Sequence, residues 1–328
     1  MDYNTLILFW ASVLVFAILV YGVLDGFDLG VGMLFGLSRN DTDRDALVAA
    51  IAPSWDGNET WLIVIGTVLF GAFSQIYAVL LSALYIPVLL MMIGLIFRGV
   101  AFEFRYNAGT PMRRFWDVGF WVGSGVVSFV QGAALGAMIA GIPVVDRQFA
   151  GGSFDWLKPF PIFCGIGLMA GYALLGACWL VMRGQDALRD RALTWGRRAA
   201  VGMALILCVS AVLTFWLQPE AWTNLLNRPW AFALPVLWAA LILTLVNALH
   251  ADKRSGFPFL LAMLSFVCAF LFFAAVFWPW MIPGSVTVAG AASPESSLRF
   301  MFWGAGLFAL PIITIYTIVI YRVFRTNP

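Results

Sequence analysis

Four acidic side chains lie inside or directly beside apolar segments near the N-terminus. Asp25 and Asp28 lie in the run VYGVLDGFDLGVG, where their i, i+3 spacing places both on one helix face. Asp56 and Glu59 lie in SWDGNETW, directly before another apolar run. Ionisable groups inside a membrane are costly and commonly belong to ion pathways or proton relays. The pattern therefore predicts a carboxylate relay for protons or ions.

Each of these acids also has a structural reading. Asp56 and Glu59 precede a predicted helix, and an acidic side chain there can cap free N–H groups. Asp25 and Asp28 can lie near the membrane interface with access to water. Gly22, Gly26 and Gly30 recur every fourth residue around them, and such spacing lets a neighbouring helix approach closely.

A second charged group, Arg98, Glu103 and Arg105, lies in LIFRGVAFEFR at the end of an apolar run. Such a group is typical of an anchor at the membrane interface. An acid between two arginines could also fix a loop through charge pairing. The sequence leaves both interpretations open.

The chain offers little that could hold a haem or a metal ion. His250 is its single histidine and lies at a predicted helix C-terminus, where a positive charge is favourable. A haem held by two histidines is excluded within this chain, and a His/Met pair would need His250. The four cysteines lie in apolar runs, without the Cys/His clusters of metal sites. We expect no cofactor and no metal in this chain.

Composition identifies the elements that must position these residues as membrane helices. Of the 328 residues 62% are hydrophobic and 11% are charged, with a mean hydropathy of +0.92; soluble domains carry about 25% charged residues. A span needs about 20 apolar residues. The sequence predicts an all-α integral membrane protein with eight spans, near 6–30, 76–98, 118–140, 160–182, 199–217, 230–249, 257–280 and 301–321. We expect one membrane domain, with a four-helix bundle in 1–182 and a second in 183–328.

The apolar stretch 61–97 has an awkward length, since it would reach about 55 Å as one helix and is short for two spans. We therefore expect 61–73 to be a short re-entrant or interfacial helix before the second span. Arginines then gather in loops 98–117 and 183–198, which the positive-inside rule places in the cytoplasm with both termini. Asp56 and Glu59 would lie on the outer side.

Several segments together resemble subunit II of cytochrome bd-type quinol oxidases, and the short loops resemble the cyanide-insensitive branch of that family. They extend from the first span to the last, so the resemblance covers nearly the whole chain. The matching segments are DGFDLGVGML (25–34), RNDTDRDALVAAIAPSWDGNETWL (39–62), FRGVAFEFR (97–105), FWDVGFWVGS (115–124), GYALLGACWL (171–180) and WPWMIPGSVTVAGAASPESSLRFM (278–301).

The resemblance implies a multi-pass subunit of the bacterial cytoplasmic membrane, surrounded by lipid, with no nucleic-acid partner. Its partner, subunit I, would carry two b-type haems, one d-type haem and the quinol site, while subunit II would bind no haem. Quinol would be oxidised on the outer side, and O2 would be reduced to water with protons from the cytoplasm. Some members hold a structural quinone, and a small single-helix accessory subunit is a further candidate partner.

The resemblance also implies roles for the charged residues. Asp25, Asp28 and Asp56 match acids of the family's proton route, with Asp56 held against Asp25 by the broken helix. Trp55 and Trp61 would fix the turn at the interface. Supporting roles fall to the neighbouring charged residues Glu59, Arg98, Glu103 and Arg105.

Two other functions fit part of the pattern. A secondary transporter would use a broken helix and carboxylates near the midplane to bind coupling ions. Against this, the acids lie in one half of the chain, and the second half has no matching broken helix. A purely structural partner subunit is the third interpretation.

Overall fold

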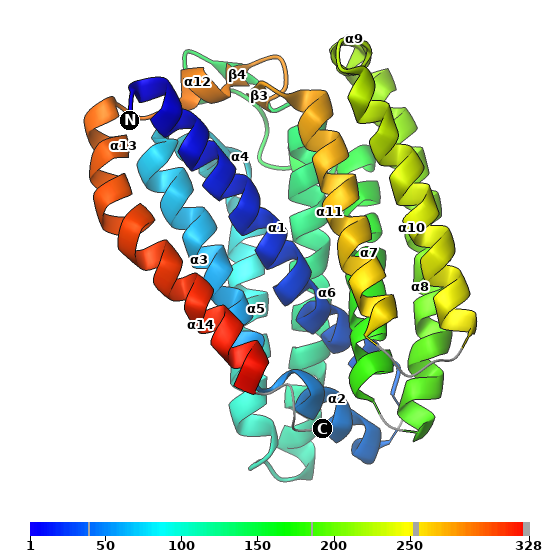
Figure 1. Cartoon of the computed structure of the whole chain (residues 1–328). Coiled ribbons are helices and arrows are strands. Elements are labelled where there is room, and N and C mark those ends of the chain that lie inside the picture. Colours follow the sequence, from blue (N-terminus) through cyan, green and yellow to red (C-terminus); the bar gives the residue numbers. More distant parts are fainter. Residues whose placement is uncertain (39, 185, 252–255, 324–328) are drawn as a thin grey trace.

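Almost all of the chain is helical in the computed structural model, which describes residues 1–38, 40–184, 186–251 and 256–323. Two small antiparallel hairpins, β1–β2 (Val144–Val145, Gln148–Phe149) and β3–β4 (Trp280–Ile282, Val286–Thr287), lie at one end of the helices (Figure 1). The helices are α1 (Tyr3–Phe35), α2 (Asp41–Ile51), α3 (Trp55–Ala72), α4 (Ser74–Ala83), α5 (Tyr85–Arg105), α6 (Thr110–Ala140), α7 (Pro159–Arg183), α8 (Asp186–Leu217), α9 (Pro219–Leu226), α10 (Ala233–His250), α11 (Phe257–Phe277), α12 (Val288–Ala291), α13 (Glu295–Met301) and α14 (Leu310–Val323).

The predicted all-α membrane fold is confirmed. Within the described residues, eight helices are long and apolar enough to cross a membrane. They are α1, α5, α6, α7, α8, α10 with the turn before it, α11, and the continuous segment Glu295–Val323, in which a π-helical stretch, Phe302–Ala309, joins α13 to α14. The largest core packs residues of α1, α2, α5, α6 and α7 against residues of α8, α10 and α11.

Segment 55–83 differs from the half-helix predicted at 61–73. α3 has 18 residues and packs along α1, and a bend of 119° then leads into α4. At the start of α3, the Tyr321 hydroxyl of α14 donates to Asn58 Oδ1 (2.9 Å). At its end, Ser297 Oγ of α13 donates to the Gly71 carbonyl (3.2 Å). α3 therefore runs beside the whole last span and turns only after Ala72 (Figure 1).

The error has a physical cause. The first six residues of α3, WDGNET, are mostly polar, so an apolar run read from the sequence begins one and a half turns late. The second predicted span, 76–98, is also displaced. In the structure it is α5, and α4 precedes it as a separate short helix.

Because α3 runs along the bundle as a full-length helix, the start of α1 and the end of α14 lie at opposite ends of the bundle (Figure 1). At one end, the Tyr3 hydroxyl donates to the Ser293 carbonyl (3.2 Å), just before α13 begins. Near the other, Tyr321 contacts the first turn of α3. This arrangement differs from the prediction that both termini lie on one side, because the eight predicted spans do not include α3 as a full-length helix.

Positive charge is strongly asymmetric about this arrangement. The end that carries β1–β2 and β3–β4 holds Arg147, Lys158, Arg228 and Arg299. Asp56 and Glu59 lie at the opposite end of the bundle, which we call the α2 end. They are therefore on the same side as the arginine-rich loops, whereas the sequence predicted the opposite side. The arginines at the α2 end are Arg44, Arg105, Arg113, Arg114, Arg183, Arg189, Arg191, Arg197, Arg198 and Arg322.

Single cysteines in a background without the native four should report this topology. We expect Asp2→Cys and Arg147→Cys to react with an impermeant maleimide from one side of the membrane, and Arg114→Cys from the other. The comparison uses oriented vesicles of both polarities. Labelling of Asp2→Cys and Arg114→Cys from the same side would contradict the passage of α3 through the membrane.

Candidate functional site

Arg98 of α5 is fully buried and binds two carboxylates. Its Nη1 donates to Asp25 Oδ1 of α1 (2.5 Å), and its Nη2 donates to Glu59 Oε2 of α3 (2.8 Å). Asp25 is also fully buried, whereas the Glu59 side chain is 27% exposed. A guanidinium in such a place requires acidic partners, because an unpaired buried charge is strongly destabilising. The predicted residues Asp25, Glu59 and Arg98 are thus in direct contact.

Asp28 belongs to the same group but is bonded differently. It is fully buried, and its Oδ2 accepts a hydrogen bond from Asn58 Nδ2 (2.7 Å). The same amide nitrogen donates to the Leu24 carbonyl (3.3 Å), and Tyr321 donates to the amide oxygen. Asp28 makes no ion pair with a described residue. Two acids therefore contact the guanidinium of Arg98, and Asp28 lies beside them on the same face of α1, bonded to Asn58.

Close helix packing positions α1 beside this group. A Cβ added at Gly30 would lie 1.9 Å from the Tyr172 carbonyl of α7, and one at Gly26 would lie 2.7 Å from the Tyr172 ring. The predicted close approach is confirmed at these two glycines, whereas a Cβ at Gly22 would meet only an ordinary contact. On the other side of the bundle, Gly94 and Gly123 bring α5 and α6 together in the same way.

Uncharged polar side chains continue from Asp25 towards the middle of the bundle. Tyr21 lies one turn before Asp25 on the same face of α1. Gln131 Nε2 donates to the Tyr21 hydroxyl (2.6 Å), and the Tyr172 hydroxyl donates to Gln131 Oε1 (3.0 Å). Sequence reasoning missed these residues, although Gln131 is the one amide in the apolar run 118–140.

The family resemblance implies that Asp56 lies against Asp25, but the structure places the two residues apart. Asp56 is exposed in the first turn of α3, one turn nearer the helix end than Glu59. Asn58 and Glu59 are the α3 residues that reach the acids of α1. Capping is not supported either, because the N-cap residue of α3 is Ser54 and its side chain makes no capping hydrogen bond.

The two tryptophans beside these residues occupy different environments. The Trp55 ring stacks on Phe102 of α5 with centroids 4.8 Å apart and lies under the Arg98 guanidinium at 6.0 Å. Trp61 is buried, and its Nε1 donates to Thr317 Oγ1 of α14 (3.2 Å). Trp61 therefore joins α3 to α14 inside the bundle.

A second charged group attaches α2 to the bundle, and we call it the α2 cluster. Arg105, almost fully buried, donates from Nε to Asp117 Oδ1 (2.5 Å) and from Nη1 to Asp45 Oδ1 (2.6 Å). Arg113 Nη2 also donates to Asp45 Oδ1 (2.6 Å), and Arg44 Nη1 to Asp117 Oδ2 (3.3 Å). The cluster thus links α2, α5 and α6.

Glu103 is not part of either charged group. It is exposed and lies two residues before Arg105, hence on nearly the opposite face of α5. The acids that pair with Arg105 are Asp45 and Asp117, which come from other helices. Charge pairing of Arg105 was correctly anticipated as one option, but with the wrong acid.

The stability that the α2 cluster contributes depends on pH. Partial burial alone would raise the pKa of Asp45, but hydrogen bonds from Arg105 and Arg113 lower that pKa below its ordinary value of 3.8. An acid with a lowered pKa in the folded state stabilises that state above its ordinary pKa. This contribution is therefore full near pH 7 and is lost as the pH falls below about 3.8.

Removing one partner of buried Arg105 should loosen α2. We expect Asp117→Asn to lower stability by about 3 kcal/mol, since breaking a buried ion pair leaves an uncompensated charge. Asp41→Asn is the matched control, because Asp41 is exposed and lies 3.9 Å from Arg44. Thermal unfolding of the detergent-purified protein measures both. Equal effects of the two variants would show that the α2 cluster contributes no more than a surface ion pair.

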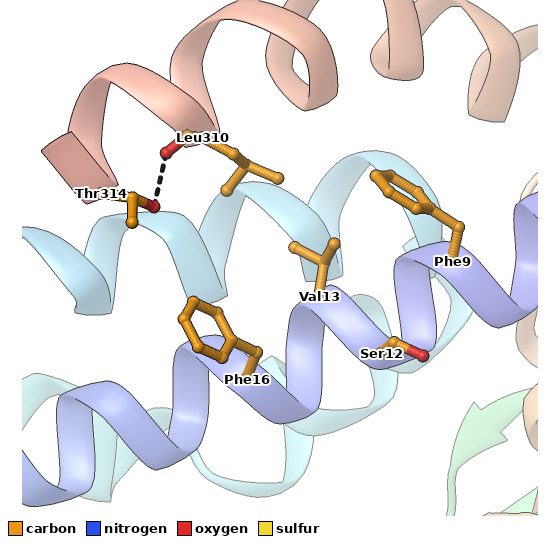
Figure 2. Close-up of a pocket in the computed structure, with 6 residues that line it drawn as sticks. All are labelled: Phe9, Ser12, Val13, Phe16, Leu310 and Thr314. Carbon is orange, nitrogen blue, oxygen red and sulfur yellow. Dashed lines mark hydrogen bonds between the residues drawn. The ribbon is translucent and has the colours of Figure 1, made fainter.

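An apolar groove lies between α1 and α14 near the N-terminal end of α1 (Figure 2). Both hydroxyl groups in the groove already donate to backbone carbonyls of their own helices. Ser12 Oγ donates to the Leu8 carbonyl (2.8 Å), and Thr314 Oγ1 donates to the Leu310 carbonyl (2.8 Å). The groove therefore offers apolar contact but no free hydroxyl proton for a quinone carbonyl. Its walls are Phe9, Ser12, Val13, Phe16, Leu310 and Thr314.

The described residues contain no group of three or more His, Cys, Asp or Glu side chains that could hold a metal ion. His250 is exposed at the end of α10, and its Nδ1 lies 2.8 Å from the Val246 carbonyl of its own helix. This position does not fit an axial ligand buried between helices.

Comparisons with known proteins agree over nearly the full length. Residues 6–324 match the family described as cytochrome bd terminal oxidase subunit II. The chain is 31% identical to cytochrome bd-I ubiquinol oxidase subunit 2 of Escherichia coli K12, covering 96% of this chain and 93% of the relative. It is 29% identical to cytochrome bd ubiquinol oxidase subunit 2 of Bacillus subtilis 168, covering 92% and 90%. A chain in the structure of bd oxidase from Geobacillus thermodenitrificans has the same fold, with a TM-score of 0.81, 18% identity, and coverage of 99% and 100%.

Proposed function

Because the chain belongs to the cytochrome bd terminal oxidase subunit II family, we propose that it works in a complex that oxidises quinol and reduces O2 to water. In this proposal it stabilises the haem-bearing subunit I and supplies carboxylates for proton uptake. The observation that carries the proton role is the group formed by buried Asp25 and Asp28 and partly exposed Glu59 beside the buried Arg98. Such a costly group inside a membrane bundle points to proton handling.

The α2 end faces the cytoplasm in this proposal, and the membrane is the bacterial cytoplasmic membrane. The positive-inside rule supports the orientation, because the arginines gather at that end. The acids then lie near the cytoplasmic surface, where protons for O2 reduction would enter. This orientation reverses the outer placement of Asp56 and Glu59 that an eight-passage count had predicted.

The acids can be ordered by exposure along such a route. Asp56 and Glu103 are exposed near the surface, where they can exchange protons with water. Glu59 is partly exposed and contacts Arg98, while Asp25 and Asp28 are buried. Protons would pass from Asp56, one turn from Glu59 on α3, through Glu59 to the buried pair. Trp55 and Phe102 cover this region with apolar surface.

The transporter alternative lacks support in the second half of the chain. Among the described residues, the buried polar side chains beyond Arg183 are Ser210, Thr214, Ser265 and Ser293, without an acid. A transporter of inverted repeats would be expected to place comparable groups in both halves.

Purification of the membrane complex tests the proposed function. A tag on this chain should co-purify a haem-bearing partner and quinol-dependent O2 uptake, since the chain itself offers only His250. His250→Ala should accordingly leave the haem spectrum of the complex unchanged. Purification without any haem, or ion-driven transport by the chain alone, would overturn the proposal.

A further inference from the structure

Asp28 is a buried acid that faces no cation directly. The ionisable groups around it are Asp25 of α1, Arg98 of α5, Glu59 of α3 and Tyr321 of α14. The guanidinium of Arg98 is bonded to Asp25 and Glu59 rather than to Asp28.

The charges of the surrounding groups indicate the protonation state of Asp28. If all three acids were ionised, the group would carry a net charge of −2 around one guanidinium in a buried site. Unpaired charges in such sites neutralise, and two carboxylates that share a site do not both ionise readily. Asp25 and Glu59 both contact the Arg98 guanidinium, at 2.5 and 2.8 Å, and Glu59 is also partly exposed to solvent, whereas Asp28 is fully buried without such a contact. The proton therefore belongs on Asp28, three residues further along the same helix face.

We propose that Asp28 is a neutral, protonated carboxylic acid, and that Asn58 and Tyr321 are positioning residues that orient it. The Leu24 carbonyl can only accept a hydrogen bond, so the amide nitrogen of Asn58 must face Leu24 and Asp28. The amide oxygen then faces the Tyr321 hydroxyl, which donates to it.

This orientation also selects the oxygen that holds the proton. Asp28 Oδ2 accepts from Asn58 and so acts as the carbonyl oxygen. Oδ1 has no hydrogen-bond partner among the described residues and is left to carry the proton. Tyr321 contributes from the last span, so α14 takes part in ordering the acid.

The inference rests on the proposed proton role and makes it more specific. A carboxyl that already holds a proton can release it and then be reprotonated through Glu59. Asp25, which contacts Arg98 directly, instead holds the guanidinium in place. The mobile proton of the buried group is thus assigned to Asp28.

Infrared spectroscopy of the whole oxidase complex tests the protonation state. With aspartate labelled with carbon-13 at the side-chain carboxyl, a protonated aspartic acid gives an isotope-sensitive carbonyl band separate from carboxylate bands. The difference between wild type and Asp28→Asn should contain this band at neutral pH. The difference between wild type and Asp56→Asn, at an exposed acid, should lack it. A wild-type band that persists in Asp28→Asn would overturn the proposal.

A second variant keeps the test decisive if Asp28→Asn fails to assemble. Tyr321→Phe removes the hydroxyl that orients Asn58 and should shift the frequency of the Asp28 band. Tyr316→Phe is the matched control, since Tyr316 lies on the same helix and is 44% exposed. An unshifted band in Tyr321→Phe would reject the positioning role. O2 uptake tests the relay separately, so protonation and relay can fail independently.

Discussion

Replacing Arg98 by glutamine should prevent stable assembly of the oxidase. The side chain is fully buried, and its loss would leave Asp25 and Glu59 as adjacent carboxylates without a cation. Removing one partner of a buried ion pair costs about 3–5 kcal/mol, a large part of the stability of most proteins. Haem per milligram of membrane protein, with blotting of this chain, measures the loss. Arg198→Gln is the control, because Arg198 is exposed on α8.

A compensated variant separates charge balance from packing. Arg98→Gln combined with Asp25→Asn and Glu59→Gln removes all three charges and nearly preserves shape. If the single variant fails because of uncompensated charge, the triple variant should restore much of the assembly. Normal assembly of Arg98→Gln alone would show that the three charges are not coupled as the distances indicate.

Asp28→Asn should produce the largest loss of turnover among the acid variants that still assemble. Asparagine has nearly the same shape as the neutral acid proposed here, so assembly and haem content should stay normal. It cannot release a proton, however, and a positioned proton-transfer group contributes about 10²–10⁴-fold to a rate. Quinol-dependent O2 uptake per haem should therefore fall by about 10²-fold or more.

Asp56→Asn provides the contrast to Asp28→Asn. Asp56 is exposed, and water or Glu59 one turn away can deliver protons in its place. Its variant should keep most of the wild-type O2 uptake. Asp25→Asn should differ from both, since it removes a direct partner of Arg98 and should reduce assembly rather than turnover alone. Equal losses of turnover for Asp28→Asn and Asp56→Asn would contradict the ordering of the acids by burial.

The spans could be predicted where apolar residues fill a helix, and α3 shows where this fails. Its first turns contain Asn58 and Glu59, which satisfy their polarity through Asp28 and Arg98 inside the bundle. Hydropathy treats such residues as solvent-exposed, so the helix start was assigned to a loop. The polar side chains of the candidate site are thus the reason why the sequence does not predict the full length of the helix that positions them.

Charges within apolar runs were sufficient to identify Asp25, Asp28 and Arg98, because such residues are rare in membranes. Their pairing could not be predicted, since it depends on contacts between helices distant in sequence. Asp117 shows this, because it lies beside Arg113 and Arg114 in the sequence but bonds to Arg105 and Arg44. Tyr321 was missed because a tyrosine near the end of a span is ordinary in membrane proteins.

Proton uptake during a single turnover is the most direct test of the central claim, that the buried acids of this chain carry protons for O2 reduction. The reduced complex would be mixed with O2 in the presence of a pH indicator, so that quinol oxidation does not limit the rate. The account predicts that Asp28→Asn binds O2 as the wild type does but takes up protons about 10²-fold more slowly. Proton uptake at the wild-type rate in a fully assembled Asp28→Asn complex would contradict it.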